Sequence, residues 1–157
     1  MTRSFLGLGS NLGDRLGLLR DAVASLDGVV GVSPVYETEP MGGPDDQGSF
    51  LNLVVELETD LDGHELLAVC RRLEAAANRV REQRWGPRTL DVDVLWMDGV
   101  TIDDDELTIP HPRMWNRRFV MVPLIDLAPE FATEGWSSKA LGEVSSIGAL
   151  DELESGG

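Results

Sequence analysis

The stretch TLDVDVLWM, residues 89–97, is the clearest β-strand pattern in the chain. Apolar, largely β-branched residues alternate in it with two aspartates, and a period of two is typical of a strand with one buried face. We expect Leu90, Val92, Val94 and Trp96 to point to that apolar face. Asp91 and Asp93 then share the opposite face.

Working outward from this strand, the chain alternates strands with helices. Leu66, Cys70, Leu73, Ala77 and Val80 recur at helical spacing after a capping Asp60 or Asp62, and Leu12, Leu16, Leu19, Val23 and Leu26 form an earlier helical stripe for which Ser10 and Asn11 offer caps. Further strands are predicted at 3–9, 29–37 and 50–58, the second of them interrupted at Ser33-Pro34. Residues 38–49 are dense in Gly, Pro and Asp and are predicted to form a loop.

The element order β-α-β-loop-β-α-β places the chain in the α+β class, with helices packed on an antiparallel sheet. Shorter helical pieces are expected at 113–130. We expect one domain over residues 1–157, in which 131–157 form a tail without motif support and with a weakly ordered end.

Composition narrows the kinds of protein that this chain can be. The chain has 157 residues and a net charge of −15, and Cys70 is its single cysteine. A disulfide scaffold or a thiolate zinc site is therefore excluded, and a surface of this charge repels nucleic acid and anionic lipid. The sequence has no apolar run of membrane-spanning length and no signal-peptide pattern, so we expect a cytoplasmic protein that does not bind a membrane. We also expect it to be a monomer that binds small molecules and no nucleic acid.

Asp91 and Asp93 are candidate metal ligands. Their Cα atoms lie about 6.6 Å apart if they are separated by two strand rises. Two carboxylates so close repel each other unless a cation joins them, and hard oxygen ligands suit Mg²⁺. The alternative is an ordinary solvated strand face.

Arginines gather just before the acidic pair. Residues 79–88 contain Arg79, Arg81, Arg84 and Arg88 against the single acid Glu82. Cations for phosphate oxygens beside carboxylates for metals are what a metal–polyphosphate site needs. A basic helix end that complements the helix dipole is the alternative for the first two arginines. A second positive group follows at His111, Arg117 and Arg118.

An acceptor pocket requires different side chains. Phe50 and Phe119 are suited to stacking a flat heterocycle, and Asn52 is suited to hydrogen bonding with its donor–acceptor edge. Asn52 follows Phe50 by two positions and is therefore expected on the same strand face. Core packing is the alternative for each phenylalanine.

Several of these segments resemble one known family. The string RWGPRTLDVD at 84–93 is similar to the signature of the 6-hydroxymethyl-7,8-dihydropterin pyrophosphokinases of folate biosynthesis. GSNLG at 9–13, the region from Tyr36 to Asn52, and PHPR at 110–113 resemble the same family in the same order. The resemblance covers roughly residues 3–130.

The resemblance implies a fold and an activity. The fold is a three-layer α/β/α sandwich around an antiparallel, ferredoxin-like sheet. The activity is a Mg²⁺-dependent transfer of pyrophosphate from ATP, the co-substrate, to the hydroxymethyl oxygen of the pterin, with release of AMP.

The resemblance also implies roles for individual residues. Asp91 and Asp93 would bind two Mg²⁺ ions, and Arg79, Arg88 and His111 would be catalytic. On the ATP side it implies Glu74, Arg79, Arg81, Trp85, Arg88, Thr108, His111 and Arg117. On the pterin side it implies Thr38, Met41, Phe50, Asn52 and Phe119.

Three other functions compete with this interpretation. A Mg²⁺-dependent nucleotidyl- or phosphotransferase with another acceptor would release a different coproduct. A non-catalytic pterin- or nucleotide-binding module would not need two metal ligands. An acidic interaction protein is supported by the net charge alone.

Overall fold

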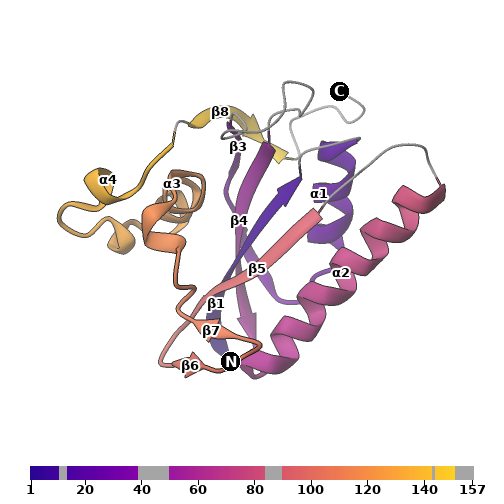
Figure 1. Ribbon diagram of the computed structural model, residues 1–157, viewed down its shortest axis with the longest axis horizontal. Coiled ribbons are helices and arrows are strands. Elements are labelled where there is room, and N and C mark those ends of the chain that lie inside the picture. Colours follow the sequence, from indigo (N-terminus) through magenta and orange to yellow (C-terminus); the bar gives the residue numbers. More distant parts are fainter. Residues whose placement is uncertain (11–13, 39–49, 84–89, 143, 151–157) are drawn as a thin grey trace.

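An antiparallel sheet forms the middle layer of the molecule (Figure 1). The computed structural model describes residues 1–10, 14–38, 50–83, 90–142 and 144–150, with the backbone alone for residues 78–83. The sheet order is β5-β1-β4-β3-β8, and β2 pairs with β4 beside β3. These strands are β1 (Thr2–Ser10), β2 (Val29–Val32), β3 (Pro34–Thr38), β4 (Phe50–Thr59), β5 (Leu90–Met97) and β8 (Val144–Ala149).

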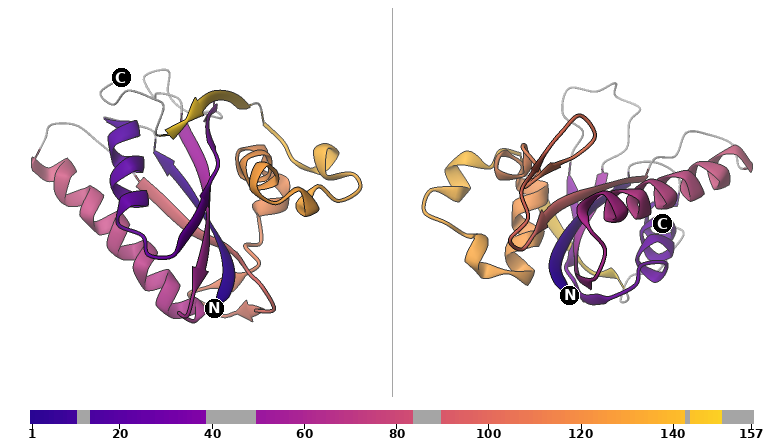
Figure 2. Two further views of the ribbon diagram at one scale, coloured as in Figure 1. Left: turned by 180° about the vertical axis from the view of Figure 1, so that it is seen from behind. Right: turned by 90° about the horizontal axis from the view of Figure 1, so that it is seen from below.

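Helices cover both faces of this sheet. α1 (Arg15–Ala24) and α2 (Gly63–Gln83) lie on one face, and α3 (Arg118–Leu127) and α4 (Trp136–Lys139) lie on the other (Figure 2). Strands β5, β1, β4 and β3 follow the order of a β-α-β-β-α-β, ferredoxin-like unit. The predicted α+β class and the three-layer α/β/α arrangement are therefore confirmed.

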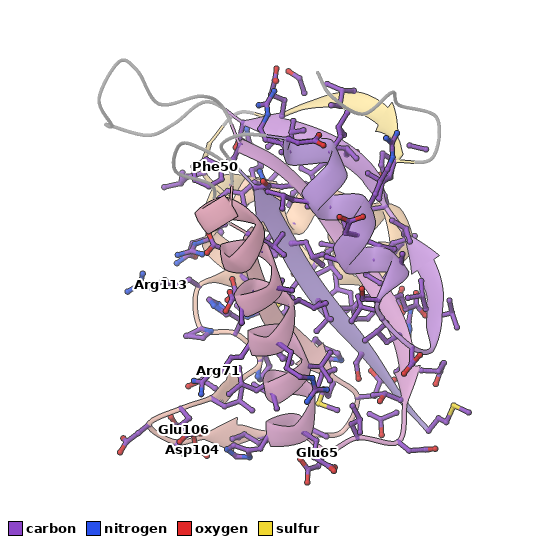
Figure 3. The ribbon with its side chains drawn as sticks, turned by 90° about the vertical axis from the view of Figure 1, so that its right-hand side faces the viewer. Phe50, Glu65, Arg71, Asp104, Glu106 and Arg113 are labelled. Atoms are coloured by element: carbon purple, nitrogen blue, oxygen red, sulfur yellow. The ribbon has the colours of Figure 1, made fainter. Side chains whose placement is uncertain are left out.

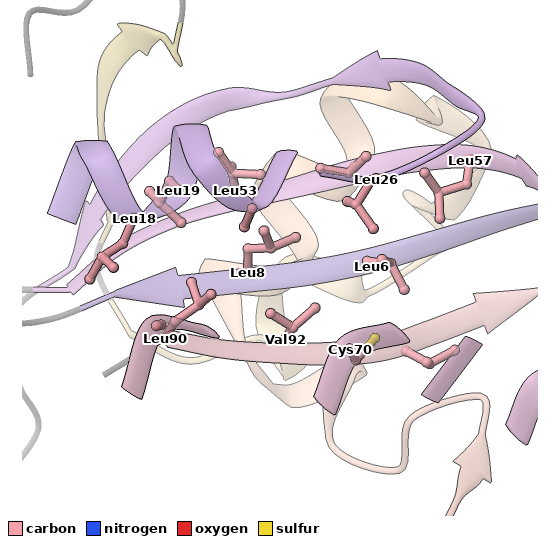
Figure 4. Packing of buried hydrophobic residues seen from close by; sticks show 14 of the residues in the cluster. Leu6, Leu8, Leu18, Leu19, Leu26, Leu53, Leu57, Cys70, Leu90 and Val92 are labelled. Carbon is pink, nitrogen blue, oxygen red and sulfur yellow. The ribbon is translucent and has the colours of Figure 1, made fainter. Parts of the chain in front are cut away.

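A closed apolar core fills the space between the sheet and the first two helices (Figure 4). Leu8 and Leu53 from the sheet and Leu19 from α1 are almost completely buried in it. Cys70 on α2 is also buried, as its place in the helical stripe predicted. Apolar side chains at helical spacing thus meet apolar side chains at strand spacing, and their burial stabilises this layer.

The caps of the two long helices differ in how well the sequence predicted them. Asp62 caps α2, because its carboxylate accepts the backbone N–H of Glu65 at 2.8 Å while Glu65 accepts that of Asp62 at 2.9 Å. For α1, the prediction of Ser10 and Asn11 was wrong. Asp14 is the cap and accepts the N–H of Gly17 at 3.0 Å, whereas Ser10 ends β1.

A bulge changes the side-chain alternation at the end of β5. Phe5 pairs with Trp96 but Leu6 pairs with Val94, so Leu95 is an extra residue between the two pairs. Trp96 consequently packs with Phe131 in the cluster under α3, with ring centroids 5.1 Å apart. The expectation that Trp96 shares a face with Leu90 was therefore wrong, because the alternation holds only up to the bulge.

The segment after residue 130 contributes to the sheet. β8 pairs with β3 from Pro34↔Ala149 to Thr38↔Val144, which extends the sheet by one strand. The sequence analysis had treated this region as a tail; residues 151–157 lie outside the described residues.

The remaining elements are short. β6 (Ile102–Asp103) and β7 (Thr108–Ile109) form a small hairpin, and the 3-10 helices η1 (Met114–Asn116) and η2 (Pro129–Phe131) flank α3. None of the described helices combines the length and the hydropathy that crossing a bilayer requires.

Candidate functional site

A cavity of about 730 Å³ opens on the α3 face of the sheet. Strands β1, β3, β4 and β5 form its floor and sides, and the start of α3 and the segment before β8 complete it. Seven of the residues singled out in the sequence line it: Thr38, Phe50, Asn52, Asp91, Asp93, Arg117 and Phe119. Segments far apart in the chain thus meet at one cavity. They bring the acidic pair, Asp91 and Asp93, close to an aromatic–amide group formed by Phe50, Asn52 and Phe119.

Glycines on β1 make room for the cavity. Gly7 and Gly9 line it, and the side chains of Leu6 and Leu8, which alternate with them along β1, belong to the closed core. A Cβ atom on Gly9 would lie 2.7 Å from Oδ1 of Asn52, closer than real contacts allow. Because β1 lies between β5 and β4, Gly9 pairs with Asp91 on one side and with Asn52 on the other. A side chain at this position would fill the space between them.

The aromatic and amide side chains gather at one end of the cavity. Phe50 and Asn52 share a face of β4, as predicted, and Thr38 pairs with Phe50 across the strands. The side-chain amide Nδ2 of Asn52 donates to Oγ1 of Thr38 at 3.1 Å, in a buried contact. This hydrogen bond fixes the orientation of the Asn52 amide and leaves its oxygen toward Gly9.

The two aspartates stand on the cavity face of the edge strand β5. Both are exposed, and neither forms an ion pair with any of the described side chains. Loss of hydration at the cavity wall raises the pKa of Asp91, and the negative charge of Asp93 raises it further. A cation bound between the carboxylates would relieve this repulsion.

Glu74 reaches the same strand from α2. Its Oε2 accepts the backbone N–H of Val92 at 3.0 Å, on the open edge of β5. Burial raises the pKa of Glu74, and the charges of Asp91 and Asp93 add to this rise, although the hydrogen bond from Val92 opposes it. Glu74 therefore interacts electrostatically with Asp91 and Asp93, although it does not line the cavity.

His111 and Arg117 approach from the segment between β7 and α3. The backbone N–H of His111 donates to the carbonyl of Leu95 at 2.8 Å, and Nδ1 of His111 accepts the N–H of Arg113 at 3.2 Å. Burial lowers the pKa of His111, and the positive charges of Arg117 and Arg113 also lower it, while Asp93 opposes them. The lowered pKa favours the neutral ring, and because Nδ1 accepts a hydrogen bond, the neutral ring carries its proton on Nε2. The Arg117 guanidinium lies 5.5 Å from the ring centroid of Phe119.

Three of the described residues predicted for the ATP side do not line the cavity: Glu74, Thr108 and His111. Thr108 pairs with Asp103 in the β6–β7 hairpin and does not line the cavity. The acidic residues Asp104 and Glu106 of that hairpin lie at the opposite end of the molecule from Phe50 (Figure 3). Asp104 and Glu106 therefore do not belong to the cavity that Asp91 and Asp93 line.

Five predicted residues lie partly or wholly outside the described part of the chain. Met41, Trp85 and Arg88 are outside the described residues. Arg79 and Arg81 belong to the last turns of α2, and their side chains are outside the description.

The sequence analysis missed several lining residues. Gly7 and Gly9 lie inside β1, in agreement with the strand predicted at 3–9, but no contact with a ligand site was predicted for them. A pair of glycines alternating with leucines in a strand is a signal of close approach that sequence alone contains. Leu95, Leu141 and Val144 also line the cavity, but the bulge and the pairing of β8 that place them are long-range features.

The donor set fits a hard divalent cation. Among the described residues, no group of three or more His, Cys, Asp or Glu side chains is arranged to hold a metal. Mg²⁺ is commonly held by one or two carboxylates together with substrate phosphates. Asp91 and Asp93 match that chemistry, and their mutual repulsion favours a bound cation.

Comparisons with known proteins agree on one family. A family model described as 7,8-dihydro-6-hydroxymethylpterin-pyrophosphokinase matches residues 5–129. The 2-amino-4-hydroxy-6-hydroxymethyldihydropteridine pyrophosphokinase of Methylorubrum extorquens is 46% identical over 140 residues, covering 86% of this chain and 88% of that protein. The protein of the same name from Bacillus subtilis is 43% identical over 141 residues, covering 87% and 84%.

A solved structure supports the fold independently. A Plasmodium falciparum HPPK-DHPS chain in complex with pteroate superposes with a TM-score of 0.57 at 14% identity. The match covers 80% of this chain and 39% of that chain. At this identity, the similarity concerns the fold alone.

Proposed function

The chain belongs to the 7,8-dihydro-6-hydroxymethylpterin-pyrophosphokinase family, and from this premise we propose how its cavity serves the reaction. The enzyme transfers the pyrophosphoryl group of ATP to 6-hydroxymethyl-7,8-dihydropterin in folate biosynthesis. The hydroxymethyl oxygen forms a bond to the β-phosphorus, and the oxygen that bridged to the α-phosphorus leaves with AMP. One observation supports the placement above all: a single cavity is lined by both the aromatic–amide end and the acidic pair.

The pterin is proposed to bind at the aromatic–amide end. Phe50 and Phe119 offer faces for stacking on a flat ring, and stacked rings gain beyond simple burial. The Asn52 amide, oriented by Thr38, supplies hydrogen bonds to the edge of the ring. Met41 is carried over from the family resemblance as a further contact.

Asp91 and Asp93 are proposed to bind two Mg²⁺ ions together with the phosphates of ATP. When bound, Mg²⁺ neutralises charge on the phosphates and stabilises the loose transition state of phosphoryl transfer. The carboxylates themselves hold the cations on the floor of the cavity, next to Gly7 and Gly9. The acceptor hydroxyl is thereby expected to meet the β-phosphate between the two ends of the cavity.

The positive and polar groups around the acidic pair are proposed to bind and orient ATP. Arg117 lines the cavity, and neutral His111 can donate from Nε2 to a phosphate oxygen or to the leaving oxygen. The family resemblance supplies the remaining proposed contacts: Glu74, Arg79, Arg81, Trp85, Arg88 and Thr108. In phosphoryl transfers, most of the rate acceleration comes from aligning the two substrates and neutralising charge on the phosphates. A strong base is therefore not required.

We also propose that the enzyme acts as a monomer in the cytoplasm. Its single cysteine, Cys70, is buried and has no partner for a disulfide, as is common in a reducing compartment. Light scattering at assay concentration should give the mass of one chain, and a dimer mass would contradict the first part.

The experiment follows AMP and pterin pyrophosphate from purified protein with ATP, Mg²⁺ and 6-hydroxymethyl-7,8-dihydropterin. Asp91→Ala and Asp93→Ala should each lower kcat/KM by about 10³-fold, because a metal supplies several kcal/mol of transition-state stabilisation. Both variants should melt at or above the wild-type temperature, since removing one carboxylate relieves repulsion. Full activity in either variant would show that the acidic pair does not hold the essential metal.

A further inference from the structure

The last wall of the cavity comes from a part of the chain that the family match does not reach. Leu141, Gly142 and Val144 line the cavity, whereas the match to the family model ends at residue 129. The family resemblance assigned no role to these residues.

Backbone hydrogen bonds hold this wall against the start of α3. The N–H of Leu141 donates to the carbonyl of Asn116 at 2.9 Å, and the N–H of Arg118 donates to the carbonyl of Leu141 at 3.0 Å. The Arg118 guanidinium also donates to the carbonyl of Gly142 at 3.3 Å and to that of Ser137 at 2.8 Å. The wall is thus attached on both sides of Arg117 and close to Phe119.

Val144 connects this wall to the part of the cavity formed by Thr38 and Asn52. It pairs with Thr38 as the first residue of β8, and Thr38 in turn accepts a hydrogen bond from Asn52. Val144 therefore lies beside Thr38, whereas Leu141 lies beside Arg117, which precedes Phe119 by two residues. Neither has a donor for a phosphate oxygen.

Leu141 is unusual in its exposure. Its side chain is 65% exposed, and of the large apolar side chains that are exposed in the described structure, it alone lines the cavity. When a flat ring covers an exposed apolar side chain, apolar surface is removed from water, and this stabilises the complex. Its fixed backbone reduces the entropy that such contact would cost.

We propose that Leu141 contacts the bound pterin and closes the outer side of its site, so that it sets affinity for the acceptor. The inference rests on the proposed binding of the pterin between Phe50 and Phe119. Leu141 is a binding residue in this scheme, while Arg118 positions the wall that carries it. The nucleotide is bound by other groups, so its affinity should not depend on Leu141.

The test measures binding of 6-hydroxymethyl-7,8-dihydropterin by calorimetry, with Mg²⁺ and the α,β-methylene analogue of ATP present. Leu141→Ala should raise the Kd for the pterin about tenfold, in the range that the loss of a few methylene contacts produces. The Kd for the ATP analogue and the kcat at saturating pterin should stay within twofold of wild type. Leu141→Met, which keeps the apolar volume, should restore pterin affinity to within about threefold.

Two further variants make the outcome decisive. Ile147→Ala removes a 36% exposed side chain of β8 that does not line the cavity, and it should leave every parameter unchanged. Asn52→Ala tests the ring site itself. If Asn52→Ala loses pterin affinity but Leu141→Ala binds as tightly as wild type, the role of Leu141 is wrong and the ring site stands. If Asn52→Ala also binds as tightly as wild type, the proposed ring site itself is wrong.

Discussion

The two faces of the central sheet are built from the same strands but serve different purposes. The face toward α1 and α2 is closed, with leucine and valine side chains packed between the sheet and both helices (Figure 4). The face toward α3 carries a smaller apolar cluster and leaves a cavity of about 730 Å³ beside it. One face therefore provides most of the apolar core, and the other provides the site.

The difference between the faces arises from single positions that alternate along a strand. In β5, Val92 packs into the closed core while Asp91 and Asp93 face the cavity. In β1, Leu8 packs into the core while Gly9 leaves space on the other side. A sheet can thus carry chemistry on one face without weakening the other, because neighbouring residues point in opposite directions.

Apart from the loss of Asp91 or Asp93, the largest effect is expected from filling the open face. Gly9→Ala places a methyl group 2.7 Å from Oδ1 of Asn52 and should displace the amide that orients the pterin. We expect kcat/KM for the pterin to fall about 100-fold, equivalent to about 2.7 kcal/mol, with KM for ATP unchanged. Steady-state kinetics with each substrate varied in turn measures this.

Gly7→Ala is the matched control for that variant. Its Cβ would lie 3.3 Å from the flexible end of the Leu95 side chain, a contact that a small shift relieves. A loss of activity in Gly7→Ala as large as in Gly9→Ala would mean that the clash with Asn52 is not the cause.

A smaller effect is expected from weakening the closed face. Val92→Ala removes two methyl groups from a fully packed site and should lower the free energy of unfolding by about 2 kcal/mol. At temperatures well below melting, kcat and both KM values should stay within twofold of wild type. Denaturant unfolding and kinetics on the same preparation test this, and a large loss of kcat would mean that the two faces are not independent.

The smallest effect is expected where the two layers are joined. The Tyr36 hydroxyl on β3 donates to the Asp126 carboxylate on α3, and burial, with this hydrogen bond and charge, raises the pKa of Tyr36 to about 12. The raised pKa means that Tyr36 contributes stability that is fully present below pH 10 and is lost as the pH rises from 10 through 12. Tyr36→Phe should lower the free energy of unfolding by about 1 kcal/mol at pH 8, since Asp126 is exposed and recovers hydration.

The pH dependence of the stability difference between the wild type and Tyr36→Phe tests this prediction. Between pH 9 and 11 the wild type should lose part of its advantage over Tyr36→Phe in denaturant unfolding. A constant difference across this range would mean that the tyrosine hydroxyl does not titrate as its surroundings indicate.

Local patterns predicted much of this structure. The alternation from Leu90 to Val94, the helical stripe containing Leu66 and Cys70, and the cap at Asp62 are confirmed, because each depends on residues a few positions apart. The grouping of Phe50 with Asn52 on one strand face follows from the same period. The resemblance to a known family then indicated that distant segments belong to one site.

Long-range contacts explain what the sequence analysis missed. Trp96 changes face because a bulge opposite Phe5 and Leu6 inserts Leu95, and no local signal marks this bulge. β8 joins the sheet only because the edge of β3 accepts it, although its own sequence, VSSIGA, is weakly apolar. In both cases the partner strand determines the conformation.

The sequence by itself determined the class of fold, the acidic pair on one face of a strand, and the family with its reaction. Each of these is carried by residue types at short spacings, which a linear chain displays directly. The tertiary structure decided that Gly9 lies between Asp91 and Asn52, that burial lowers the pKa of His111, and that Leu141 lines the cavity. These features depend on which strands become neighbours and how much water they exclude, and both are set only when the whole chain packs.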